Sequence, residues 1–208
     1  MKSVFNFLIK PVKSRYNNEI DVDGKKLIVN TEIFNHQYIS REAEVISIPL
    51  AFETPIKVGD KVIVHHNIFR RWHDMRGVER NSSNYIKEDL YSCDIEQIYA
   101  YKPSISKNTK ETWKALDGYC FVQPIKNKDM FANKSENELV GILIYISEDA
   151  KKLGLNIGDL VGITKSSQYE FHIDGKLLYR VSNQHILIKY EYKGDEEEYN
   201  PSWAHSSS

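Results

Sequence analysis

The chain has 208 residues, of which 41% are hydrophobic and 12% aromatic, and its formal net charge is −1. Such a near-neutral chain lacks the overall basic field of nucleic-acid and anionic-membrane binders, and no stretch approaches the roughly 18–20 apolar residues of a membrane-spanning helix. Cys93 and Cys120 are too few for a disulfide framework, so we expect two buried thiols in a reducing compartment. The stretch 1–13 meets Pro11 too early for a secretory signal, and we expect a cytoplasmic protein.

The first strand is predicted in LIKPV (8–12), and a long segment of mostly polar residues (14–42) follows it. Within that segment, NEIDVDGKKLIVN can be interpreted in two ways. Alternating apolar residues around Asp23-Gly24 favour a packed β-hairpin with a type I′ turn. The same segment can also be a long mobile loop that presents an apolar anchor to a partner. A hairpin tip can carry an anchor as well, so the two interpretations overlap.

The next two blocks, AEVISIP (43–49) and IKVGDKVIV (56–64), are rich in β-branched residues and predict strands. Between the apolar runs of the second block stands Gly59-Asp60. Glycine accepts a positive φ without steric cost, and aspartate bonds to nearby backbone, so the pair predicts a tight turn that enters a strand at 61–64.

The segment from 64 to 89 concentrates arginine and tryptophan, at Arg70, Arg71, Trp72 and Arg76. This local basic and aromatic cluster favours a subunit or partner contact, where both residue types are enriched. Stacking on nucleic-acid bases is the second interpretation and ranks well behind it.

Histidines in the same segment raise the question of a metal site. His65, His66 and His73 could be joined by Cys93, but none of the spacings matches a known ligand motif. Adjacent histidines on a strand also point to opposite faces, so we predict no metal site and no cofactor.

Four blocks of the first half recur in the same order in the second half. The pairs are LIKPV and FVQPI, AEVISIP and VGILIYI, IKVGDKVIV and LNIGDLVGI, and EDLYSCDIEQIYAYK and GKLLYRVSNQHILIKY. The matched positions, 113, 97, 99 and 88 residues apart, are Pro11 and Pro124, Val45 and Ile142, Gly59 and Gly158, and Tyr91 and Tyr179. A fixed order with changing gaps indicates a duplicated unit whose loops differ in length.

The sequence therefore predicts an all-β protein of two tandem small β-barrels, at residues 1–102 and 118–192. A short polar linker spans 103–117, and an acidic, then serine-rich tail spans 193–208. We expect the tail to be mobile.

The block order resembles that of the GroES-like co-chaperonins. The resemblance is carried by IKP and VQP after each first strand, by the two Gly-Asp phrases, and by LYSCDIEQIYAYK and LYRVSNQHILIKYE as final strands. It implies a tandem form of that family, similar to the tandem co-chaperonins of chloroplasts. Compact, divergent members of the family include phage-encoded ones, so this chain could be a phage protein. In the family, the long loop after the first strand carries an apolar tripeptide that docks on the chaperonin. Here GKKLIVNTEI occupies that place, so the resemblance implies that Leu27, Ile28 and Val29 bind the partner.

The second copy departs from the family pattern. Its corresponding segment, KNKDMFANKSENE, is shorter and has no apolar tripeptide, which implies a scaffold role for the second barrel.

The resemblance implies a homo-oligomeric ring that caps a GroEL-type chaperonin. No phosphate-binding glycine loop or nucleophile motif is present, so we expect no enzyme activity. Two alternatives stay open, a virion or capsid-associated structural protein and a small binding module that uses the Arg/Trp cluster. A phage protein would act in the host cytoplasm or in the virion.

Overall fold

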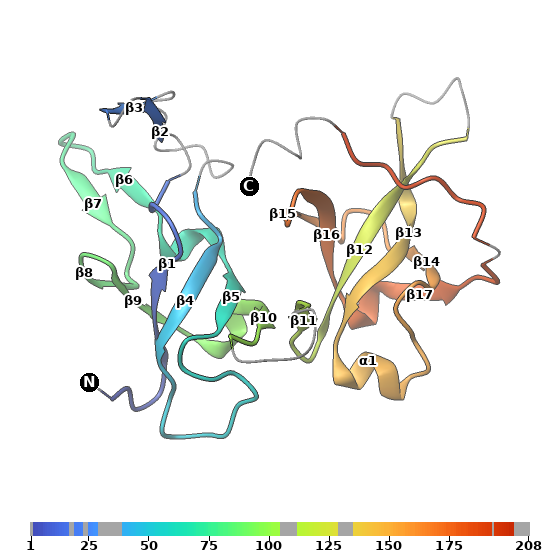
Figure 1. Ribbon diagram of the computed structural model, residues 1–208, viewed down its shortest axis with the longest axis horizontal. Helices are drawn as coiled ribbons and strands as arrows, with labels where there is room; N and C mark the ends of the chain where they lie inside the picture. Colours follow the sequence, from blue (N-terminus) through green and yellow to red (C-terminus); the bar gives the residue numbers. More distant parts are fainter. Residues whose placement is uncertain are drawn as a thin grey trace. The chain divides into compact units, whose positions relative to one another are not determined.

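The computed structural model (Figure 1) describes residues 2–16, 19–22, 25–28, 39–104, 112–128, 135–192 and 194–201, with the backbone alone for 19–22 and 25–28. The chain divides into two compact units, Met1–Trp113 and Lys114–Ser208, which we call unit 1 and unit 2. Both are mostly antiparallel β-sheet, and the described residues contain one short α-helix. The predicted all-β class is therefore confirmed.

Unit 1 is built around one sheet. Its strands are β1 (Phe7–Pro11), β4 (Glu42–Ser47), β5 (Lys61–Val64), β8 (Tyr85–Lys87), β9 (Leu90–Cys93) and β10 (Ile98–Lys102). Two hairpins lie outside this sheet, β2 (Glu19–Val22) with β3 (Lys25–Ile28), and β6 (Arg71–His73) with β7 (Glu79–Asn81). Short 3-10 turns, η2 (His66–Ile68) and η3 (Ile95–Gln97), precede β6 and β10. Within unit 1 the strand order is β10-β5-β4-β1-β9-β8.

Unit 2 uses the same plan. Its elements are β11 (Lys114–Ala115), β12 (Tyr119–Lys126), β13 (Glu136–Ile146), α1 (Glu148–Lys152), β14 (Leu160–Ile163), β15 (Tyr169–Ile173), β16 (Lys176–Ser182), η4 (Asn183–His185) and β17 (Ile186–Lys189). The six-stranded sheet has the order β17-β14-β13-β12-β16-β15. Each strand occupies the place that its counterpart occupies in unit 1, so the sequence repeat corresponds to a repeat of topology.

Strand register confirms two of the matches made from the sequence. Ile9 of β1 lies opposite Tyr91, and Val122 of β12 lies opposite Tyr179. The prolines two positions further on, Pro11 and Pro124, are equivalent in the same way.

The match between Val45 and Ile142 was wrong by one residue. Val45 accepts a hydrogen bond from the backbone N–H of Gly59, and Leu143 accepts the corresponding bond from Gly158, both at 2.8 Å. Val45 is therefore equivalent to Leu143. The sequence left this choice open because β13 is apolar at several consecutive positions, whereas side chains in a strand change face at every residue.

Each hydrogen-bonded strand order is linear and ends at two edges, so no closed barrel is found in the described part of the chain. The structure thus confirms the β-sheets, and the closure of each sheet into a barrel stays a prediction.

Each unit has an apolar core over its first strand. In unit 1 the fully buried side chains include Phe7, Ile9 and Phe69, and the rings of Phe69 and Tyr91 meet edge to face at 4.8 Å. In unit 2, Cys120, Val122 and Leu143 belong to a buried cluster with Val181. Both cysteines are buried and unpaired, as the sequence predicts.

Part of the tail that we expected to be mobile packs on unit 2 (Figure 1). Glu198 forms an antiparallel bridge with Ile125, and the backbone N–H of Tyr199 donates to the carbonyl of Pro124 at 2.8 Å. The side chain of Gln123, which is fully buried, donates to the carbonyl of Tyr199 at 3.0 Å. The three glutamates of the DEEE run each pair with a lysine, namely Glu196 with Lys128, Glu197 with Lys126 and Glu198 with Lys176. This expectation was wrong for residues 194–201, because a buried amide and backbone pairing hold the segment in place.

Candidate functional site

The two ends of the first long segment lie side by side in unit 1. Tyr16 forms an antiparallel bridge with Ile39, and the backbone N–H of Ser40 donates to the carbonyl of Arg15 at 3.1 Å. Tyr16 and Ile39 are both buried. The chain on either side of residues 17–38 is therefore joined by backbone pairing and by two buried side chains.

The predicted anchor residues fall partly within the described chain. Leu27 and Ile28 lie on β3, opposite Ile20 and Glu19 of β2. The hairpin predicted around Asp23-Gly24 is confirmed in its two strands, while the turn itself and Val29 lie outside the described residues. Whether Leu27, Ile28 and Val29 bind a partner stays a prediction.

Arg15 connects the paired ends of the long segment to the Arg/Trp-rich segment at residues 64–89. Its guanidinium donates to the carbonyls of Phe69 and Arg70, at 2.6 and 3.1 Å, and to the Asn81 side chain at 2.6 Å. It also lies over the ring of Tyr91, 5.4 Å from the ring centroid. Burial lowers the pKa of this arginine, although the tyrosine phenols nearby work in the opposite direction. An arginine with this many fixed contacts acts as a structural clamp.

Tyr16 completes the connection from the other side. Its hydroxyl accepts a hydrogen bond from the backbone N–H of Arg71 at 2.7 Å, and the Arg71 guanidinium lies 4.8 Å from the centre of the Tyr16 ring. Arg71 also pairs with Glu79 across the hairpin at 3.2 Å. Arg71 is therefore largely occupied by contacts within its own unit.

The other face of the β6–β7 hairpin is open to solvent. Successive side chains of a strand alternate in direction, so Trp72 points away from the face that carries Arg71. Trp72 is 43% exposed, and Met75 and Val78 at the hairpin turn are exposed too. Arg70 and Arg76 are exposed, and among the described residues their side chains have no ion pair or ring contact. We call these five residues (Arg70, Trp72, Met75, Arg76 and Val78) the ribbon face.

A local network holds the hairpin turn rigid. Asp74 accepts hydrogen bonds from the backbone N–H groups of Val78 and Arg76, at 3.0 and 2.9 Å, and its carboxylate pairs with Arg80 at 3.0 Å. The bond from Val78 is the main cause that lowers the pKa of the Asp74 carboxyl below its usual value.

The histidines lie differently from what we expected. The rings of His65 and His66 stack with their centroids 4.4 Å apart and do not point to opposite faces. The reason is that β5 ends at Val64 and His66 opens the turn η2, so strand alternation does not apply. In the part of the chain that the structure describes, no group of three or more His, Cys, Asp or Glu residues could hold a metal ion.

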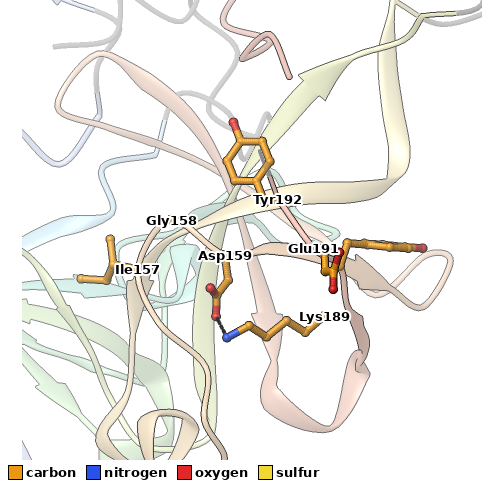
Figure 2. A pocket seen from close by; sticks show the side chains of 7 residues that line it. Ile157, Gly158, Asp159, Lys189, Glu191 and Tyr192 are labelled. Atoms are coloured by element: carbon orange, nitrogen blue, oxygen red, sulfur yellow. Dashed lines mark ion pairs between the residues drawn. The ribbon is translucent and has the colours of Figure 1, made fainter. Parts of the chain in front are cut away.

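A second candidate lies at the Gly-Asp turn of unit 2. An open depression of about 560 Å³ lies at this turn, lined by Ile157, Gly158, Asp159, Lys189, Tyr190, Glu191 and Tyr192. Figure 2 shows its lining residues. The ammonium group of Lys189 reaches into it and pairs with Oδ2 of Asp159 at 2.7 Å. A depression this open offers surface charge but no enclosed site for a small ligand.

The thiols offer no nucleophile. Burial raises the pKa of Cys120 to about 11 and raises that of Cys93 as well, so both are neutral near pH 7. The Cys120 thiol donates to the side-chain oxygen of Asn183 at 3.0 Å, which ties β12 to η4.

Arg15 and Tyr16 are the functional residues that sequence reasoning missed. Their signal was an arginine and a tyrosine just after the first strand, at the entry to the long segment.

No family model and no curated protein matches the chain. No helix in the described residues is both long and apolar enough to cross a membrane.

Proposed function

We propose that this protein is a tandem GroES-like co-chaperonin that forms a ring, caps a GroEL-type chaperonin and performs no chemistry of its own. The observation that carries the proposal is the strand order shared by the two units, with the same Gly-Asp turn in each. This regularity supports two copies of one small domain, and the sequence blocks that lie on these strands are the ones that resemble the family.

The units differ in a way that fits the proposal. Between its first two sheet strands, unit 1 carries residues 12–41, which hold the β2–β3 hairpin, whereas only residues 127–135 separate β12 from β13. One docking element per chain is what a ring of two-domain subunits needs in order to match a sevenfold partner. The second unit then acts as scaffold.

The docking element would be the tripeptide Leu27, Ile28 and Val29. Full burial of three aliphatic side chains contributes on the order of 1.5–3 kcal/mol each, and ordering of the segment offsets much of this. The net affinity per chain is then modest, and a ring of several chains multiplies it.

The test is co-sedimentation of the protein with a GroEL-type chaperonin, with and without nucleotide. We expect nucleotide-dependent binding by the wild-type chain and its loss in the double variant Ile28→Ser/Val29→Ser. A matched control, Leu153→Ser/Ile157→Ser, replaces two exposed aliphatic residues of unit 2 and should bind normally.

Two results would reject parts of the proposal. If the wild-type chain assembles but never binds the chaperonin, a structural role as in a virion replaces the co-chaperonin function. If the double variant melts several degrees lower yet still binds when folded, these residues stabilise the unit and are not the anchor.

A further inference from the structure

We infer that the ribbon face, which consists of Arg70, Trp72, Met75, Arg76 and Val78, is a second docking element for the same partner as residues 17–38. The partner surface that fits it carries carboxylates beside apolar side chains. This inference rests on the proposed function and extends it to a site with two parts.

The ribbon and the two ends of the long segment are held by the same residues, Arg15 and Tyr16. Arg71 donates its backbone N–H to the hydroxyl of Tyr16, and Tyr16 closes the base of the long segment by its bridge with Ile39. Arg15, one residue earlier, holds the carbonyls of Phe69 and Arg70 where the chain enters β6. Arg15 and Tyr16 therefore hold both the start of the ribbon and the two ends of the long segment.

The two faces of the β6–β7 hairpin make different contacts. Arg71 is used inside the unit, by the Tyr16 ring and by Glu79. Arg70 and Arg76 are exposed and make no such contact with the part of the chain that the structure describes. Trp72, which lies between them in the sequence, is 43% exposed. Tryptophan and arginine are the residues that most often dominate the energy of protein interfaces.

The turn between β6 and β7 is held in one conformation by hydrogen bonds. Arg80 and two backbone N–H groups hold the Asp74 carboxylate, which fixes the turn between β6 and β7. A preorganised turn that exposes Met75 fully and Val78 by half loses little conformational entropy on binding.

Charge complementarity selects the partner chemistry. Arg70 and Arg76, which pair with no carboxylate in the described residues, favour carboxylates on a partner, while Trp72, Met75 and Val78 favour apolar side chains. A nucleic acid would need a larger basic surface, and the hairpin also contains Asp74 and Glu79, so we choose an acidic protein surface.

The experiment compares three forms of the full-length chain for binding to a GroEL-type chaperonin with nucleotide, at low and at high salt. The ribbon variant is Arg70→Glu/Trp72→Ser/Arg76→Glu. The control variant, Lys152→Glu/Lys165→Glu, makes the same charge change at two exposed lysines of unit 2. All three forms are first checked for an unchanged melting temperature and unchanged sedimentation in the absence of the chaperonin.

We expect the ribbon variant to bind on the order of tenfold more weakly than the wild type at low salt, with a smaller difference at high salt. The control variant should bind like the wild type. A milder variant, Arg70→Gln/Arg76→Gln, removes the charges and keeps Trp72, so it should lose part of the affinity even if the triple variant folds poorly.

Several results would overturn the inference. Equal binding by the ribbon variant and the control would remove the second docking element and leave the proposed function intact. A change of sedimentation without the chaperonin would assign the ribbon to contacts between subunits, and loss of binding to single-stranded nucleic acid would assign it to that ligand. If the wild type itself does not bind a chaperonin, the proposed function and the inference fail together.

Discussion

Asp60 and Asp159 occupy the same turn in the two units and meet different surroundings. Both turns place glycine at a positive φ, 88° for Gly59 and 89° for Gly158, and in both the aspartate Oδ2 accepts a backbone N–H three residues before it. In unit 1 the backbone N–H of Ser104 also donates to Asp60, and the carboxylate is buried. In unit 2 that second donor is replaced by the side chain of Lys189, and the turn is open (Figure 2).

The comparison separates what the repeat conserves from what it leaves variable. The hydrogen bonds that join the turn to the neighbouring strand are the same, since Val45 and Leu143 each donate to the aspartate carbonyl at 2.9 Å. The residues that contact the aspartate from outside the turn differ between the units. In unit 1 this residue is Ser104, which follows β10, and in unit 2 it is Lys189, at the end of β17. The fold therefore depends on the strand contacts, and the outer surface of each unit is available for separate uses.

The sharpest test of this equivalence is the substitution Gly141→Ala. A Cβ at Gly141 would lie 2.6 Å from the backbone carbonyl oxygen of Gln123 and would clash with Val122, although its counterpart Ala43 in unit 1 carries a Cβ without strain. We expect unit 2 to lose about 3 kcal/mol of unfolding free energy. Urea denaturation measures the loss, and hydrogen exchange of β12 and β13 assigns it to unit 2.

The matched control is Ala43→Gly, which removes one methyl group from the equivalent place and should cost about 1 kcal/mol. Similar losses for the two substitutions would mean that β13 can move away from β12, and the register equivalence would then not restrict the side chain.

A smaller difference is expected between Asp60→Ala and Asp159→Ala. Asp60 is 3% exposed and accepts two backbone N–H groups, at 2.8 and 2.9 Å, which would be left buried without an acceptor. Its removal should cost about 2 kcal/mol, whereas removal of Asp159, whose side chain is 18% exposed, should cost about 1 kcal/mol. The measurement is the shift of the denaturation midpoint of each unit. Equal losses would show that the cover over the turn contributes nothing to stability.

The smallest effect concerns the two thiols at alkaline pH. Burial raises the pKa of Cys120 to about 11 and raises the pKa of Cys93, each above the ordinary thiol value of about 8.5. The stability that these thiols contribute is therefore complete below about pH 8.5 and is lost as the pH rises toward 11. At pH 9 we expect a loss of about 0.8 kcal/mol for each thiol relative to neutral pH.

Denaturation of the wild type and of the Cys93→Ala and Cys120→Ala variants between pH 7 and pH 9 measures this loss. Each variant should show a shallower decrease with pH than the wild type. An identical pH dependence in all three proteins would contradict the assignment of the decrease to the thiols.

Many of the strands and turns were predictable because interactions between residues close in the sequence control them. Gly59 and Gly158 need a positive φ, and Tyr91 and Tyr179 hold the same register position, so their sequence matches agree with the structure. The shift at Val45 was not predictable, since a run of apolar residues gives no sign of which face each side chain takes.

The candidate site was less predictable than the strands and turns. The composition of the insert pointed to Arg70, Arg71, Trp72 and Arg76 as one group, but the structure divides them, with Arg71 turned toward Tyr16 and the others exposed. Strand alternation alone could have separated Arg71 from Trp72. It could not have shown that Arg15, 55 residues earlier in the chain, lies beneath them.

The β class, the internal repeat and the two Gly-Asp turns could be predicted from the residues alone, because β-propensity and the demand for a positive φ act within a few residues. Which surfaces are covered within a unit depends on how distant segments pack. The packing of residues 194–201 on β12, the clamp of Arg15 and the stacked His65 and His66 depend on contacts between segments far apart in the sequence or on where a strand stops. Such contacts depend on geometry and burial across the whole unit, which no local pattern of residues contains.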